Sequence, residues 1–282
     1  MELVTESGTW QQYPPEDDPQ EHTVVGTVLR LEGVHSPQLD NQRDVYVYLP
    51  PSYRDTDRRY PVIYMHDGQN LFDRATSFGE EWGVDQTLEE GAEEGMEAIV
   101  VGIPNLGPER LNEYSPWWEP SHESGGRGDA YVDFLAQTLK PLVDRDFRTF
   151  PECEHTGITG SSMGGLISLY AFFREPRVFG FAGVMSPALW FGERKIFDFV
   201  EAAPFPGGKI YLDVGTQEGD EELTDVRRLR DLLLAKGYRK KKDFLYVVEM
   251  GGAHNEAAWA RRLKRELRFL LGVPHQKQRR TS

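Results

Sequence analysis

The sequence lacks the residue patterns that build disulfides, membrane spans or metal sites. Its single cysteine, Cys153, excludes an internal disulfide bond and suits a reducing compartment. No apolar run is long enough to cross a bilayer, which excludes a transmembrane helix. The N-terminus has neither a basic start nor an apolar stretch, so we expect no secretory signal and a cytoplasmic location.

Positive charge is also scarce. The chain has 32 Lys and Arg against 46 Asp and Glu, which gives a net charge of −14. Such a chain is repelled by phosphate backbones and anionic lipids, so we expect neither nucleic acid nor membrane as a partner. The seven histidines include no H-x-x-x-H or H-x-H pair, and we expect no metal and no other cofactor. A small-molecule partner is the class that remains, and the oligomeric state is left open.

The length of 282 residues and a hydrophobic content of 39% are sufficient for one α/β domain. The polar, proline-bearing residues 1–21 are expected to form a loose arm. Residues 22–273 are expected to form a single domain, followed by a flexible basic tail over residues 274–282.

The hydrophobic pattern changes along the chain from alternation to separate apolar runs. Residues 23–31 and 44–49 alternate as two antiparallel strands at one edge of a sheet would. Buried strands are predicted at 61–65, 98–102, 155–159, 181–185, 210–214 and 244–248, and helices at 84–91, 130–147, 166–173, 196–203, 223–236 and 256–271. Pro141 is expected to kink or shorten the second helix. An antiparallel edge followed by a mostly parallel sheet with helices on both faces is the α/β-hydrolase fold.

The segment Gly160-Ser161-Ser162-Met163-Gly164-Gly165 contains a G-x-S-x-G motif between a predicted strand and a predicted helix. In that context the motif forms a sharp turn that exposes its serine at a helix N-terminus, where backbone N–H groups favour negative charge. A glycine-rich packing turn is the alternative interpretation. The flanking elements favour Ser162 as a nucleophile.

A hydrolase of this plan has its nucleophile, acid and histidine in that order along the chain. His254, in Gly251-Gly252-Ala253-His254, lies between the last predicted strand and the last predicted helix. The other six histidines precede the nucleophile strand, lie inside it or lie in the tail. His254 is therefore the candidate base, with a helix-capping or packing role as the alternative.

The acid should follow the strand predicted at 210–214. Glu218 is the first candidate, because it lies past the strand end with enough reach to contact an imidazole. Asp220 is the alternative, and Asp213, inside the strand, is a third candidate. The acids after Asp220 are typical of the first turn of the following helix.

An oxyanion hole needs two backbone donors. One should be the N–H of Met163, directly after the nucleophile. The other should come from the loop after the strand at 61–65, where the amides of Gly68, Gln69 and Asn70 are candidates. His66 and Asp67 are interpreted as residues that fix this loop and not as a catalytic pair.

Five motifs in order along residues 25–272 resemble the putative esterase family, which is similar to esterase D and includes feruloyl esterases, enterochelin esterases, S-formylglutathione hydrolases and mycolyltransferases. The motifs are His66-Asp67-Gly68-Gln69-Asn70-Leu71-Phe72; Val101-Gly102-Ile103-Pro104-Asn105 with Arg110 and Glu113-Tyr114-Ser115-Pro116; Gly160 to Gly165; Ser186-Pro187-Ala188-Leu189-Trp190; and Gly252-Ala253-His254. The resemblance implies Ser162 as nucleophile and His254 as base. It also implies an acid just past the seventh strand, where many members have Gly-Thr-x-Asp and this chain has Gly215-Thr216-Gln217-Glu218.

The predicted activity is that of a serine esterase, acting through an acyl-enzyme intermediate. A pocket of Asp67, Asn70, Arg110, Tyr114, Trp117, Trp118 and Trp190 would suit an aryl, sugar-linked or siderophore-like ester, or an acyl group with an anion. Alternatively, the aromatic residues pack the loop 104–129, and Arg110 pairs with Glu113 or Asp129. An acyltransferase or thioesterase with the same triad is the alternative function, and a non-catalytic binding protein is a further one.

Overall fold

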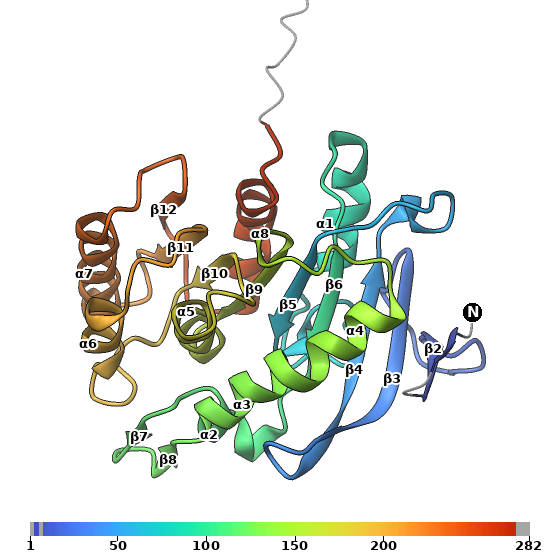
Figure 1. The fold of residues 1–282 in the computed structure, drawn as a ribbon, viewed down its shortest axis with the longest axis horizontal. Helices are drawn as coiled ribbons and strands as arrows, with labels where there is room; N and C mark the ends of the chain where they lie inside the picture. Colours follow the sequence, from blue (N-terminus) through green and yellow to red (C-terminus); the bar gives the residue numbers. More distant parts are fainter. Residues whose placement is uncertain (1–2, 6–7, 275–282) are drawn as a thin grey trace, which may run out of the picture.

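A ten-stranded sheet forms the centre of the protein in the computed structural model, which describes residues 3–5 and 8–274 (Figure 1). Across the sheet the strands are β1 (Leu3–Thr5), β2 (Gly8–Tyr13), β3 (Thr27–Ser36), β4 (Asn41–Leu49), β6 (Ile99–Ile103), β5 (Val62–His66), β9 (Thr156–Ser161), β10 (Phe181–Met185), β11 (Lys209–Gly215) and β12 (Phe244–Glu249). Neighbours from β1 to β6 are antiparallel, and neighbours from β6 to β12 are parallel. The predicted antiparallel edge and parallel core are confirmed.

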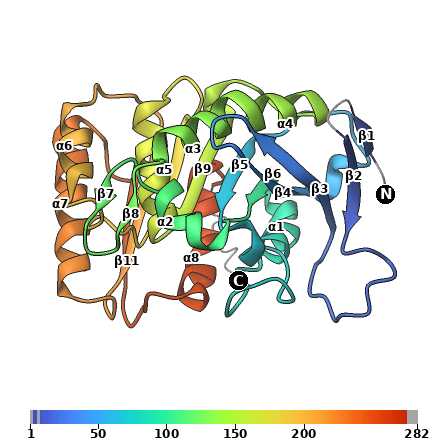
Figure 2. The same ribbon diagram turned by 90° about the horizontal axis from the view of Figure 1, so that it is seen from below.

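Helices cover both faces of the sheet (Figure 2). One face carries α1 (Val84–Gly91) and α8 (Glu256–Leu270); the other carries α3 (Gly128–Phe134), α4 (Lys140–Asp146), α5 (Met163–Arg174), α6 (Lys195–Ala202) and α7 (Asp220–Lys236). A short α2 (Arg110–Glu113) and a hairpin of β7 (Trp118–Glu119) and β8 (Ser124–Gly125) lie in the loop after β6. Strand residues divide between two hydrophobic clusters, as in β5, where Val62 and Tyr64 face one cluster and Ile63 the other. This is the α/β-hydrolase arrangement that the pattern predicted. Within the described residues, no helix combines the length and the apolar character needed to cross a bilayer.

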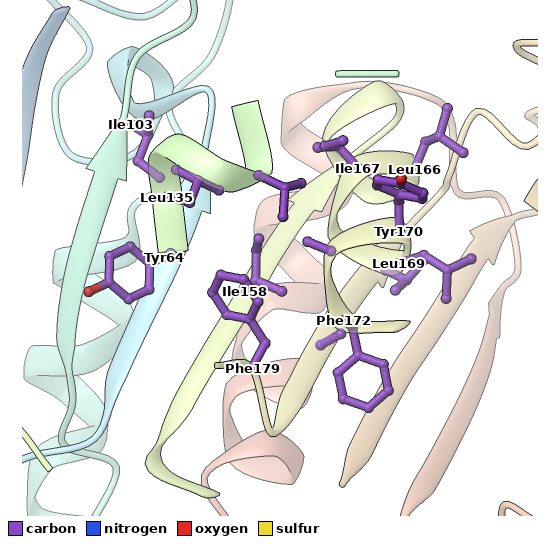
Figure 3. Packing of buried hydrophobic residues seen from close by; sticks show 14 of the residues in the cluster. Tyr64, Ile103, Leu135, Ile158, Leu166, Ile167, Leu169, Tyr170, Phe172 and Phe179 are labelled. Atoms are coloured by element: carbon purple, nitrogen blue, oxygen red, sulfur yellow. The ribbon is translucent and has the colours of Figure 1, made fainter. Parts of the chain in front are cut away.

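The larger hydrophobic cluster fixes the junction between β9 and α5 (Figure 3). Ile158 of β9 and Leu166 and Leu169 of α5 are fully buried, and Phe172 is 1% exposed. Each such side chain stabilises the fold by about 1.5–3 kcal/mol relative to an exposed position. The hydrophobic cluster therefore holds the connection between β9 and α5 rigidly in place.

The N-terminal segment differs from the expected loose arm. Residues 8–13 form β2, which pairs antiparallel with β3. Trp10 is fully buried, donates a hydrogen bond from Nε1 to Asp146 at 2.9 Å and packs edge-on against Phe147. The arm prediction was wrong here because Trp10 and Tyr13 anchor a segment that is otherwise polar. The predicted tail lies outside the described residues from residue 275 onward.

Pro141 does not end the helix that contains it. The helix begins at Gly128 and passes through a π-helical stretch, Leu135–Leu139, into α4. Pro141 is the second residue of α4, directly after that stretch. A π turn changes the local hydrogen-bond spacing, which lets the chain absorb the missing N–H of a proline.

Candidate active site

Ser162 lies on the turn between β9 and α5 with φ of 57° and ψ of −120°. This backbone conformation is unfavourable for serine and persists where the surroundings enforce it. The Ser162 N–H donates to the carbonyl of Met185 at 3.0 Å, and its own carbonyl accepts from the N–H of Ala188 at 3.0 Å. A Cβ on Gly160 would lie 2.9 Å from the backbone of Gly164, so the turn requires glycine there. The result is a serine side chain presented at the start of α5.

His254 connects Ser162 to Glu218. Its Nε2 is 2.9 Å from Ser162 Oγ, and its Nδ1 is 2.9 Å from Glu218 Oε2. The imidazole is 39% exposed, whereas the Glu218 side chain is fully buried. A hydroxyl that contacts a base, which in turn contacts a carboxylate, is the arrangement that activates a nucleophile.

The Glu218 carboxylate is fixed on both oxygens. Oε1 accepts hydrogen bonds from the N–H of Gly215 at 2.6 Å and from Ser186 Oγ at 2.7 Å, while Oε2 faces His254. Burial raises the pKa of Glu218, but the hydrogen bonds from His254, Ser186 and Gly215 outweigh it and hold the pKa below its ordinary value. The carboxylate is therefore ionised at neutral pH.

The other two acid candidates lie elsewhere. Asp220 is exposed in the first turn of α7 and has no hydrogen bond to His254. Asp213 is buried in β11, where one carboxylate oxygen accepts from the N–H of Ser186 at 3.0 Å and the other lies 3.0 Å from Arg262 Nε. Burial raises the pKa of Asp213 to about 7, although the positive charge of Arg262 opposes the shift. Within residues 3–5 and 8–274, Glu218 is the one of the three that reaches His254.

Ser186 and Arg262 contact Glu218 on the side of its carboxylate away from His254, a role that the sequence analysis did not predict. Arg262 Nη2 donates to Ser186 Oγ at 2.8 Å and lies 3.5 Å from Glu218 Oε1. Trp259 Nε1 also donates to Ser186 Oγ, at 3.0 Å. A hydroxyl that accepts two hydrogen bonds has its own proton left for a third partner, so Ser186 donates to Glu218. Trp259 and Arg262 follow His254 by five and eight residues, and this closeness is the signal that was available.

The predicted oxyanion donors belong to the start of α5 and to the loop after β5. Met163 is the first residue of α5, so its N–H has no partner within the helix. Gly68–Asn70 forms a 3-10 turn after β5, in which the Asn70 N–H already donates to Asp67. A Cβ on Gly68 would lie 2.4 Å from the backbone N of Ile103, so the loop needs glycine to pack against β6. Gln69 lines the same cavity as Ser162.

His66 and Asp67 hold this loop in place. His66 is buried with Nδ1 2.9 Å from Tyr131 Oη, and burial lowers the pKa of its imidazole to about 3. It is therefore neutral at physiological pH. The Asp67 N–H donates to Tyr114 Oη at 3.1 Å. The geometry matches the anchoring role inferred from the sequence.

Arg110 forms a bidentate pair with Asp67. Its Nε and Nη2 donate to the two carboxylate oxygens at 2.8 and 2.9 Å. The sequence suggested Glu113 or Asp129 instead, but Glu113 pairs with Arg43 at 2.8 Å and Asp129 lies 3.3 Å from Arg174. The guanidinium is thus already matched to an anion, which weakens the expectation that it receives an anionic acyl group.

A cavity of about 430 Å³ opens beside Ser162 and His254. Its lining is Asp67, Gln69, Asn70, Phe78, Trp82, Asn105, Arg110, Ser161, Ser162, His254, Glu256 and Trp259. Asp67, Asn70 and Arg110 were predicted pocket residues. The aromatic wall comes from Trp82 and Trp259, which lie 5.9 Å apart between ring centroids, and was missed.

The other predicted pocket residues do not line this cavity. Tyr114 is fully buried under the loop of Asp67, and Trp117 packs edge-on against Tyr170 at 5.4 Å between ring centroids. Trp118 is 52% exposed in β7, and Trp190 lines a separate depression. Tyr114 and Trp117 therefore pack the loop 104–129 and its surroundings, which was the alternative interpretation. Aromatic content alone did not reveal which way each ring points.

Comparisons with known proteins identify the family and support the fold. A family model described as Putative esterase matches residues 36–270. The uncharacterized protein YbbA of Bacillus subtilis (strain 168) is 26% identical over 255 residues, which are 86% of this chain and 98% of that protein. The siderophore enterobactin esterase of Emericella nidulans is 28% identical over 169 residues, 52% of each protein. The crystal structure of BES protein from Bacillus cereus shares the fold, with a TM-score of 0.70 and 21% identity over 91% of this chain and 98% of that one.

Proposed function

The chain belongs to the putative esterase family and is a carboxylic ester hydrolase, and on this premise we propose that Ser162, His254 and Glu218 are its catalytic triad. The family match confirms the resemblance inferred from the motifs. The observation that supports the triad is the pair of 2.9 Å contacts that His254 makes, one to Ser162 Oγ and one to Glu218 Oε2.

In the proposed mechanism, His254 Nε2 takes the Ser162 proton as Oγ attacks the ester carbonyl carbon. The Glu218 carboxylate keeps the Nδ1 proton facing it and stabilises the imidazolium that forms. The N–H groups of Met163 and Gln69 bind the developing oxyanion, and one such donor typically contributes about 2.7–4 kcal/mol to transition-state binding. His254 then protonates the leaving alcohol, and water activated by His254 releases the acyl group from Ser162.

The proposed substrate is a small ester, aryl, sugar-linked or siderophore-like, with one part in the cavity that Trp82 and Trp259 help to line. A volume of about 430 Å³ falls within the ordinary range for small-molecule sites, about 300–1,000 Å³. The relative named siderophore enterobactin esterase supports including a siderophore-type ester among the candidates.

A substrate panel tests this function. Wild type and Ser162→Ala would be assayed on p-nitrophenyl acetate, a feruloyl ester, a thioester and a siderophore-type ester. We expect Ser162→Ala to lose at least about 10³-fold in kcat on every substrate that wild type hydrolyses, since the nucleophile is gone. Ser121→Ala, which removes an exposed hydroxyl away from the cavity, is the matched control and should keep its activity. Turnover retained by Ser162→Ala would refute the assignment.

A further inference from the structure

The charged groups that line the cavity do not cancel. Asp67 and Arg110 form a bidentate pair and neutralise each other. Burial raises the pKa of Asp67, but the charge and hydrogen bonds of Arg110 outweigh it and keep the carboxylate ionised. Among the described charged side chains that line the cavity, Glu256 has no ion-pair partner of opposite charge.

Glu256 is the first residue of α8 and follows His254 by two positions. Its side chain is partly buried, and among the described residues it has no hydrogen bond or ion pair with another side chain. The charged or titratable groups that face it are Asp67, Arg110 and His254. Burial raises its pKa, its own backbone N–H and the positive groups oppose the shift, and the net direction is upward.

A carboxylate at this position is not needed to cap the helix. Acidic residues are common in first turns because they interact favourably with the helix dipole. In α8, however, the N-cap is Asn255, whose Oδ1 already accepts from the N–H of Ala258 at 3.0 Å. Glu256 is instead one of the residues that line the cavity with Ser162 and His254, and its carboxyl group interacts electrostatically with Asp67, Arg110 and His254.

The indole rings of Trp82 and Trp259 belong to the lining of the same cavity. Trp259 packs against the His254 imidazole with 5.0 Å between ring centroids and against Trp82 at 5.9 Å. Tryptophan faces attract cations, most strongly where water is partly excluded. An unpaired carboxylate together with indole rings is the chemistry that recognises an ammonium or trimethylammonium group.

We propose that Glu256 is a specificity-determining residue through which the cavity selects esters that carry a positive charge over isosteric esters that carry a negative one. The proposal rests on the function proposed above. A substrate ammonium within about 6 Å of Glu256 would gain about three- to tenfold in kcat/KM, given a partly solvated site, and a carboxylate would lose a similar factor.

Isosteric substrates test this selectivity. One series has 4-methylumbelliferyl esters whose acyl chains end in trimethylammonium, tert-butyl or carboxylate; the other compares acetylthiocholine with 3,3-dimethylbutyl thioacetate. Assays at pH 8 and low salt keep carboxylates ionised and limit screening. Wild type should prefer the cationic member over the neutral one in at least one series and disfavour the anionic one. A wild-type preference for the anionic member would overturn the proposal.

Variants then assign the selectivity to Glu256. Glu256→Gln should lower the cation-to-anion ratio of kcat/KM by about tenfold with little change on the neutral ester, and Glu256→Lys should reverse it. Glu221→Gln, which removes an exposed first-turn acid from α7 away from the cavity, should keep the wild-type ratio. An unchanged ratio in Glu256→Gln would refute the inference. If Ser162→Ala also hydrolyses the panel, the proposed function fails instead, so the two failures are distinguishable.

Discussion

Replacing Glu218 with glutamine gives a prediction whose direction follows from the hydrogen bonds around the carboxylate. Oε1 receives the Gly215 N–H at 2.6 Å and the Ser186 hydroxyl at 2.7 Å. Both partners are donors, because Ser186 Oγ is itself occupied by Arg262 and Trp259. The glutamine carbonyl must therefore take the Oε1 position, and its NH2 group must face His254.

That orientation forces the wrong histidine tautomer. Facing an NH2 donor, His254 Nδ1 has to accept, so the ring proton moves to Nε2, opposite Ser162 Oγ. The base then has no lone pair for the serine proton, and the negative charge that stabilises imidazolium is also lost. A comparable acid-to-amide change in a serine protease triad lowers kcat by about 10⁴, so we expect Glu218→Gln to lose about 10³ to 10⁴-fold, or about 4–5.5 kcal/mol of transition-state stabilisation.

Steady-state kinetics on p-nitrophenyl acetate would measure this effect. The loss should fall on kcat, with KM within about threefold, because the substrate cavity is unchanged. Asp220→Asn, at the alternative acid position, is the matched control and should stay within about twofold of wild type, since surface substitutions of this kind have small effects. A loss below tenfold in Glu218→Gln, or a large loss in Asp220→Asn, would show that Glu218 is not the acid of the triad.

Three further variants test the surroundings of the site. Burial raises the pKa of Glu266 from 4.5 to about 8. Between those pH values the folded protein keeps a proton on this carboxyl group that the unfolded chain has released, so the free energy of unfolding falls as the pH rises. Glu266→Gln should remove this pH-dependent loss, and its stability relative to wild type, measured by urea unfolding, should rise by up to about 5 kcal/mol between pH 5 and pH 8. A gain that is equal at both pH values would contradict this. Arg43→Met should destabilise the fold by about 3–5 kcal/mol, because it leaves the fully buried Glu113 carboxylate unpaired; a change in the urea midpoint worth less than 1 kcal/mol would argue against that pair. Tyr114→Phe leaves the Asp67 N–H without its acceptor and should cost about 1–3 kcal/mol of stability and lower kcat, whereas unchanged values for both would show that the loop is held otherwise.

The strands and helices of the parallel core could be predicted from the sequence because their patterns are strong. The helix expected at 84–91 and the strand expected at 181–185 have the observed boundaries. An apolar run bounded by turn residues is a local pattern, so each of these elements can be predicted from its own sequence without its neighbours in the fold. β2 was missed because its stability comes from two aromatic anchors, Trp10 and Tyr13, and not from alternation along the segment.

In the candidate site, the sequence predicted the catalytic residues better than the residues that line the substrate cavity. Ser162, His254 and Glu218 each follow a strand end in a fixed topological order, so the chain order predicted the serine and the histidine and limited the acid to three candidates, of which Glu218 was the first. The substrate cavity depends on side-chain directions across distant elements: Trp117 turns toward α5 and α6, whereas Trp82 and Trp259 turn toward Ser162. Arg262, in the second turn of α8, contacts Ser186 and Glu218. These residues are distant in the sequence, so no local pattern predicts the contact.

Covalent labelling would identify the nucleophile of the enzyme directly. Wild-type protein would be treated with a fluorophosphonate, digested with trypsin and examined by mass spectrometry with fragmentation of the peptide spanning residues 149–174, which contains both Ser161 and Ser162. We predict one adduct, located on Ser162, and its loss in Ser162→Ala and strong reduction in His254→Ala. An adduct on another residue, no adduct on active wild-type enzyme, or undiminished labelling of Ser162→Ala would show that Ser162 is not the nucleophile.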